Sequence, residues 1–212
     1  MAKAVANLFP PPPTIDLDGL RLRPLRPTDA EAVYAYLREP LVTDLTSYPV
    51  ASLALAEAII ERSRNRWAAG EPAKWGVCLP DDDRPVGTCG FNEWSATHRW
   101  AELAYELAPA HWGRGLMGRA VAEVVGWAFR HDLIDRVQAF VRVDNERSAR
   151  LLERAGFVRE GRLRGYRPCR GRRYDFYIYG LLRSDRPNVS QPKQAEPGAA
   201  ADGGGMTAFP GS

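Results

Sequence analysis

Alternation of apolar and polar residues along the chain predicts most of its strands. Residues 99–107 give the clearest case, because Ala, Leu, Tyr and Leu occupy every second position from Ala101 to Leu107. Glu102, Ala104 and Glu106 fall between them and therefore lie on the opposite face of the strand. Other runs predict further strands at 20–25, 74–79, 85–94, 136–143, 157–166 and 174–182.

Apolar residues at helical spacing predict three helices between these strands. One covers residues 52–68, and another runs from a glycine-rich loop to near His131. A third follows Asp144 and Asn145, either of which can cap it, and ends at Gly156. Residues 28–31 have the Thr-x-x-Glu pattern of a capping box and predict a further helix start.

These elements predict an α/β (α+β) fold with one domain at residues 17–183. Long antiparallel stretches and one strand–helix–strand crossover give a mixed, mostly antiparallel twisted sheet of six to seven strands, with helices on both faces. Residues 1–16 contain a run of prolines and are expected to form a flexible leader. Residues 184–212 are rich in Pro, Gly, Ala and Ser, so a disordered tail is expected.

Composition and charge exclude several classes of protein. The 212 residues are 45% hydrophobic and 26% charged, with a formal net charge of +3, which is ordinary for a globular domain and too mild for a dedicated DNA-binding protein. No apolar run is long enough to span a bilayer, so no membrane partner is expected. Prolines at 10–13 interrupt any signal peptide. The basic stretch 159–173 is either a solvated face or a surface that attracts an anionic ligand or RNA.

Cysteine usage favours a reducing compartment and therefore a cytoplasmic protein. Cys78, Cys89 and Cys169 are odd in number and far apart, and no CxxC pair is present. The three histidines are dispersed as well. A disulfide framework and a metal site are therefore not expected.

The densest chemical signal is a glycine-rich run between a predicted strand and a predicted helix. The run reads His111-Trp112-Gly113-Arg114-Gly115-Leu116-Met117-Gly118. Glycines let the backbone turn tightly and approach a ligand closely. The first amides of the following helix have no intrahelical partner and carry the positive end of its dipole, so this turn is suited to binding phosphate.

The run also matches the dinucleotide fingerprint G-x-G-x-x-G, with Asp144 as the acid after the next strand. We reject that interpretation for three reasons. Residues 108–112 separate the first glycine from the strand. The run lies in the second half of the ordered chain. Only one crossover unit follows it, whereas a doubly wound sheet needs several.

In this context the run resembles the acetyl-CoA loop of the GNAT superfamily of N-acetyltransferases, Q/R-x-x-G-x-G/A, with Trp112 in the first place and Met117 where a small residue is usual. The surrounding motif, YEL-x-P-x-x-WGRG, is similar to the corresponding sequence in the ribosomal-protein N-terminal acetyltransferase branch. A second motif, N-x-x-S-x-x-L-x-x-x-G-F, begins at Asn145 and ends at Phe157. Together with residues 160–179, the resemblance covers about residues 19–183.

The resemblance implies acetyl-CoA as co-substrate, no metal, and a central pair of strands that splays to admit the pantetheine arm. The arm would bond the strand edges as an extra strand does. The donor-binding residues that it implies are Leu107, Trp112, Gly113, Arg114, Gly115, Leu116, Met117, Gly118, Asn145 and Ser148. Among these, Ser148 is a candidate proton donor to the leaving thiolate, and Asn145 either orients the thioester or only caps a helix.

The residue that takes the proton of the amine is expected on the strand 99–107. Glu106 is nearest the glycine loop, and Glu93 on the neighbouring strand is the second possibility; both are also compatible with plain solvent-facing positions. Some branches of the family carry a glutamate as the base where this chain has Phe140, so this chain has no counterpart of that base. Glu93, Tyr166 and Asp175 are the residues expected to bind the acceptor. Tyr166 and Asp175 would wall its site, or only pack or pair within the final strands.

The function expected is therefore transfer of the acetyl group of acetyl-CoA to a primary amine by direct attack. The acceptor is a protein N-terminus or a small-molecule amine, and the protein is a monomer or a homodimer. A non-catalytic acyl-CoA sensor of the same fold is the alternative. A dinucleotide-binding protein that uses Gly113, Gly115 and Gly118 is a third hypothesis.

Overall fold

The computed structural model describes residues 9–132 and 134–186. They form an eight-stranded sheet in the order β1-β2-β3-β4-β5-β6-β8-β7. The strands are β1 (Ile15–Leu17), β2 (Leu20–Pro24), β3 (Lys74–Leu79), β4 (Asp82–Ser95), β5 (Trp100–Leu107), β6 (Arg136–Arg142), β7 (Val158–Cys169) and β8 (Arg172–Leu182). The helices are α1 (Ala30–Leu37), α2 (Pro40–Thr43), α3 (Leu53–Ala68), α4 (Leu116–Arg130) and α5 (Glu146–Arg154), with 3₁₀ turns η1 (Pro27–Asp29), η2 (Pro109–His111) and η3 (Arg183–Asp185).

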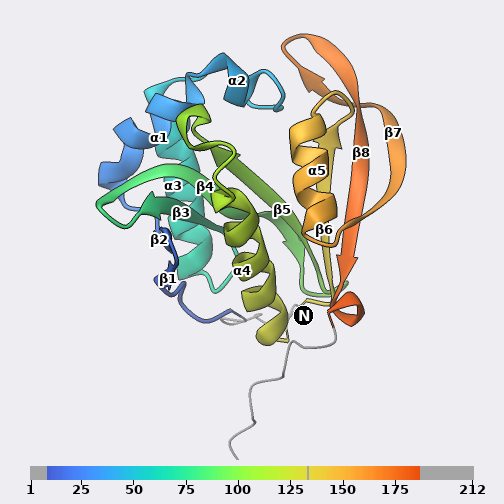
Figure 1. Cartoon of the computed structure of the whole chain (residues 1–212), viewed down its shortest axis with the longest axis horizontal. Helices are drawn as coiled ribbons and strands as arrows, with labels where there is room; N and C mark the ends of the chain where they lie inside the picture. The colour runs from blue at the N-terminus through green and yellow to red at the C-terminus, as the bar shows by residue number, and fades with distance from the viewer. Residues whose placement is uncertain (1–8, 133, 187–212) are drawn as a thin grey trace, which may run out of the picture.

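The mixed, mostly antiparallel sheet is confirmed, and so are the helices on both faces. Helices α4 and α5 lie on one face and α1 and α3 on the other (Figure 1). The sheet has one strand more than the six to seven expected. The additional strand is β1, which pairs antiparallel with β2 inside the segment assigned to the leader.

The central strands β5 and β6 are the parallel pair, and they splay as expected. Their pairing covers only Trp100 to Glu102 on β5, opposite Arg136 to Gln138 on β6. Beyond Glu102 the two strands separate, and β6 continues its antiparallel pairing with β8. Figure 1 shows α4 and α5 on either side of this opening. The edges of β5 and β6 are therefore available to a ligand at that point.

The residues of the expected stripe on α4 are all buried, because the helix packs on the sheet through one apolar face. They are Met117, Ala120, Val121, Val124, Val125 and Ala128. Helix α3 begins where expected, since the Ser52 hydroxyl accepts a hydrogen bond from the Leu55 amide. Gly156 follows α5 with a φ of +89°, the left-handed conformation that ends a helix.

Residues 9–16, the second half of the expected leader, pack against the domain. Phe9 is only 2% exposed and lies between the rings of Trp94 and Trp127. The Pro13 carbonyl accepts a hydrogen bond from the Trp75 indole. The proline run suggested flexibility, but an aromatic side chain that fills a tryptophan cluster anchors this segment. Of the expected tail, Ser184 to Arg186 are described; residues 187–212 lie outside the described part.

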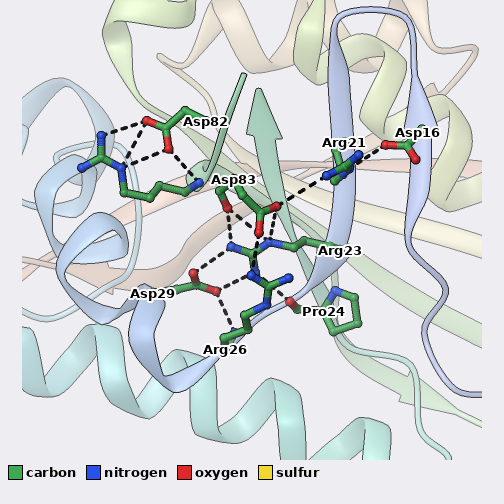
Figure 2. Close-up of polar contacts among 9 residues, drawn as sticks. Asp16, Arg21, Arg23, Pro24, Arg26, Asp29, Asp82 and Asp83 are labelled. Atoms are coloured by element: carbon green, nitrogen blue, oxygen red, sulfur yellow. Dashed lines mark hydrogen bonds and ion pairs between the residues drawn. The ribbon is translucent and has the colours of Figure 1, made fainter. Parts of the chain in front are cut away.

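The helix start predicted at residues 28–31 is confirmed by α1, which begins at Ala30, but the capping box is wrong: the residue before the helix is Asp29, and it makes no side-chain cap hydrogen bond. Its carboxylate accepts two hydrogen bonds of 2.8 Å from the buried guanidinium of Arg23 and one from the Arg26 amide. Asp83 completes the network by pairing with Arg23 and Arg26 (Figure 2). The network ties β2 and η1 to the start of β4.

Candidate active site

The glycine run forms an open turn into α4. Gly113 and Gly115 have φ values of +77° and +73°, a backbone conformation that residues other than glycine rarely adopt. A Cβ atom added at either glycine, or at Gly118, would meet no heavy atom within 4 Å. The first backbone bond of α4 runs from the Arg119 amide to the Gly115 carbonyl, so the amides before Arg119 have no partner within the helix. The turn therefore offers amide donors to open space.

A cavity of about 520 Å³ extends along this turn and is called the glycine-loop cavity. Its opposite wall is α5, which contributes Arg147, Arg150 and Arg154. The expected donor-binding residues that line it are Leu107, Trp112, Gly113, Gly115, Leu116, Met117 and Gly118. Free amides at a helix N-terminus, opposite a wall with three arginines, suit the phosphates of a nucleotide-like ligand, although Arg147 lies over Trp112 and Arg150 pairs with Glu146 at 2.9 Å. Arg114 is exposed, does not line the cavity, and its Nη1 lies 3.2 Å from the His111 Nδ1.

Trp112 joins the end of β5 to α5. Its indole N–H donates a 2.8 Å hydrogen bond to the Leu107 carbonyl. The guanidinium of Arg147 lies 3.5 Å from the centre of the indole ring, which is the geometry of a cation–π contact. Trp112 thereby fixes the position of the Leu107 backbone beside the opening of the sheet.

Asn145 and Ser148 meet Tyr105 at the N-terminus of α5. The Asn145 Oδ1 accepts from the Ser148 amide at 3.2 Å, so the capping role expected of Asn145 is present. The Ser148 Oγ lies 2.7 Å from the Tyr105 hydroxyl. Burial raises the pKa of Tyr105 well above its usual range, so this phenol stays protonated at any working pH.

Two smaller cavities continue from the glycine loop through the opening of the sheet. The first, of about 130 Å³, shares Trp112 and Met117 with the glycine-loop cavity. The second, of about 250 Å³, is called the glutamate cavity because Glu102 and Glu106 line it. Both smaller cavities are lined by Tyr105, Glu106, Asn145 and Ser148. The three cavities therefore form one path, with the Tyr105–Ser148 contact at its centre.

Glu106 is buried and fully engaged, not solvent-facing. Its carboxylate accepts from Lys74 at 3.0 and 3.1 Å, from Tyr48 at 2.7 Å, and from Thr88. Both Lys74 and Glu106 have side chains less than 10% exposed, so the two charges neutralise each other inside the protein. Burial, and then the charge of Glu106, raises the pKa of Tyr48.

Glu102 is buried too, yet it has a much poorer set of donors. Among residues 9–132 and 134–186, only Arg167 donates to it, through one nitrogen at 3.1 and 3.2 Å from the two oxygens. Arg167 belongs to β7 and reaches Glu102 from across the sheet opening. An ionised carboxylate can accept about four hydrogen bonds, so Glu102 presents spare acceptor capacity to the glutamate cavity.

The three residues expected to bind the acceptor do not line the glutamate cavity. Glu93 is half exposed and pairs with Arg62 at 2.6 Å. Asp175 accepts from Arg162 and from the Gly165 amide. Tyr166 stands behind the wall, with its ring 4.9 Å from that of Phe140, which does line the cavity.

Sequence reasoning missed Tyr48, Tyr105 and Arg167, which line the path, and Lys74, which pairs with Glu106 beside it. The lysine at the start of an otherwise apolar strand was the one usable signal, because a buried ammonium requires a carboxylate partner. Tyr105 was assigned to the core face from its alternation. Tyr48 lies in the segment between α2 and α3, where no periodicity marks it.

In the described ranges no group of three or more His, Cys, Asp or Glu side chains could hold a metal ion. No helix within those ranges is long and apolar enough to cross a bilayer. Cys78, Cys89 and Cys169 are free and buried. Burial raises the pKa of the Cys78 thiol to about 11, so that thiol is protonated at neutral pH.

Comparisons with known proteins agree with this arrangement. The family model "Acetyltransferase (GNAT) domain" matches residues 19–158. The N-acetyltransferase p20 of Bacillus licheniformis is 30% identical over 173 residues, which cover 81% of this chain and 97% of that protein. The N-acetyltransferase YoaA of Bacillus subtilis (strain 168) is 33% identical over 172 residues with the same coverage.

A solved structure has the same fold. RimL, a ribosomal L7/L12 alpha-N-protein acetyltransferase in complex with coenzyme A, superposes with a TM-score of 0.73 at 19% identity, over 80% of this chain and 98% of its own. The family match spans the glycine loop and the N-terminus of α5, the two elements that border the path of cavities. The chain therefore belongs to the GNAT acetyltransferase family, and it is an acyl-CoA-dependent acetyltransferase that uses acetyl-CoA as its co-substrate.

Proposed function

We propose that the chain transfers the acetyl group of acetyl-CoA to a primary amine by direct attack. The observation that carries the proposal is the path of three cavities through the splayed sheet. The path offers the donor and the acceptor different cavities, with Tyr105 and Ser148 lining the two smaller ones. Two substrates that meet at one point need no covalent enzyme intermediate, because each is held in reach of the other.

The glycine-loop cavity is the proposed donor site. The α4 amides, together with Arg147 and Arg150, would hold the phosphates of acetyl-CoA. The free edges of β5 and β6 would pair with its pantetheine arm. Bound there, acetyl-CoA supplies the acyl group as a reactive thioester.

The reaction forms a C–N bond and breaks a C–S bond, so one proton must leave the amine and one must reach sulfur. We assign the second transfer to Ser148, whose Oγ is held by the protonated Tyr105 hydroxyl. We assign the first to Glu106. Since its oxygens are already occupied, the amine proton reaches Glu106 by exchange through the Tyr48 hydroxyl, which donates to it at 2.7 Å.

The proposed acceptor is the N-terminus of a protein, and the ribosomal substrate in the name of the structural relative RimL supports that class. A small-molecule amine is the other candidate. The glutamate cavity, at about 250 Å³, would take only the reacting end of either acceptor.

The test is to measure release of the CoA thiol from acetyl-CoA with peptides and small amines as acceptors. Amine-dependent release that disappears in Ser148→Ala supports the proposal. A parallel melting-point titration with acetyl-CoA and NAD separates the alternatives, since specific ligands raise the melting point. A shift with acetyl-CoA and no release with any amine would favour the non-catalytic sensor. A shift with NAD alone would favour dinucleotide binding.

A further inference from the structure

Glu102 is the one carboxylate of the glutamate cavity that is both buried and short of donors. Its side chain is 9% exposed, and a single nitrogen of Arg167 serves both of its oxygens. Each oxygen has this one partner, whereas an ionised carboxylate can accept about four hydrogen bonds, so acceptor capacity remains on the side of the cavity. A ligand that donates a hydrogen bond into the cavity would use it.

Arg167 is held in place independently of Glu102. Its guanidinium lies over the rings of Phe140, Tyr166 and Phe176, at 4.9, 5.0 and 5.9 Å from their centres. This aromatic wall fixes the direction of the guanidinium, while the side chain remains 30% exposed. Glu102 and Arg167 together therefore present an acceptor and a donor side by side at one end of the cavity.

The other end of the cavity is the reaction centre, at Glu106 and Ser148. Glu102 and Glu106 are four residues apart on the same face of β5, a separation of about 13 Å at roughly 3.3 Å per residue. A group bound at Glu102 is therefore not the amine that reacts. It belongs to the same acceptor about four extended residues away from that amine.

We propose that Glu102 and Arg167 form a subsite for a backbone peptide group near the third or fourth residue of an extended acceptor peptide. This inference rests on the proposed function and specifies its acceptor. A peptide group has one donor and one acceptor, which match the free capacity of Glu102 and of Arg167. A second ammonium group would be repelled by Arg167, and a carboxylate would be repelled by Glu102. Binding at the subsite therefore depends on the length of the peptide and not on the identity of its side chains.

The experiment compares alanine peptides of one to five residues, all as C-terminal amides, as acceptors at saturating acetyl-CoA. We expect kcat/KM to rise about tenfold between the two-residue and the four-residue peptide, mainly through KM. Such a rise corresponds to about one hydrogen bond to a charged group, at the lower end of its usual range. In Glu102→Gln and in Arg167→Met, kcat/KM should differ by no more than about twofold between the two-residue and the four-residue peptide. Glu57→Gln and Arg64→Met, on the exposed face of α3, are matched controls that keep the full gain.

The outcomes are distinguishable. Rates that do not depend on peptide length would overturn the subsite and leave the acetyltransfer to amines standing. A preference for diamines that Glu102→Gln abolishes would overturn it too, because Glu102 would then bind a cation. If no amine is acetylated, the proposed function fails and the subsite fails with it. A length series without a rise on the unaltered enzyme overturns the subsite even where a variant does not fold.

Discussion

The Tyr105 hydroxyl lies 2.7 Å from the Ser148 Oγ and connects β5 to the first turn of α5. The contact is made where β5 and β6 have ceased to pair, so it spans the opening of the sheet. Asn145 fixes the Ser148 backbone, and burial keeps the Tyr105 phenol protonated. The two hydroxyls therefore form a short donor chain at the centre of the cavity path.

Removal of this chain is expected to lower kcat more than it affects binding. Ser148→Ala should reduce kcat by about 100-fold, the lower end for loss of a general acid, because a thiolate is a weak base. Tyr105→Phe should have a smaller effect, and Ser148→Thr, which retains the hydroxyl, should preserve most of the activity. Steady-state kinetics and the acetyl-CoA-induced melting shift measure the two effects. A Ser148→Ala enzyme with unchanged kcat would contradict the proton-donor role.

The glycine loop is expected to tolerate no side chain at its left-handed positions. Gly113→Ala and Gly115→Ala each impose about 1–2 kcal/mol of backbone strain and place a methyl group in the donor cavity. The KM for acetyl-CoA should therefore rise together with the loss of stability. Gly171→Ala is the control, because Gly171 has a φ of +78° and open space around it but lies in the β7–β8 turn. That variant should lose stability and keep its KM.

Periodicity and turn residues predicted the architecture of this chain well. The strand at 99–107, the helix at 52–68 and the glycine loop were each placed within one or two residues, because their signals are local. The resemblance to a known family then identified the splayed pair, which no local pattern encodes. The contact of Phe9 with distant tryptophans could not be predicted, since proline content says nothing of the packing of a neighbouring aromatic side chain.

The site was predicted only in part, for a physical reason. Alternation places Glu102 and Glu106 on the face opposite the apolar residues, but it does not show what covers that face. The partners come from far along the chain: Lys74 for Glu106 and Arg167 for Glu102. Only the folded arrangement reveals that one carboxylate is saturated and the other is not.

The buried ion pair between Lys74 and Glu106 is expected to show strong coupling. Lys74→Met leaves a buried carboxylate without a counter-charge, which costs about 3–5 kcal/mol. The double variant Lys74→Met/Glu106→Gln removes both charges and should be more stable than Lys74→Met alone. Urea unfolding of the two single variants and the double variant measures the coupling energy. If the losses of unfolding free energy in the two single variants add up to that of the double variant, the two charges do not stabilise each other.

Phe9 should contribute to the stability of the whole domain, although it precedes the first strand. Its ring is 2% exposed and contacts both Trp94 and Trp127, so Phe9→Ala should cost about 3–5 kcal/mol. Val50→Ala is the control, because Val50 is 82% exposed and its truncation should change little. Thermal unfolding of both variants provides the comparison. Equal melting points for Phe9→Ala and the unaltered chain would mean that residues 9–16 detach readily, as the proline run suggests. A large loss confined to Phe9→Ala would extend the folded domain to residue 9, well before the boundary at residue 17 that the sequence predicts.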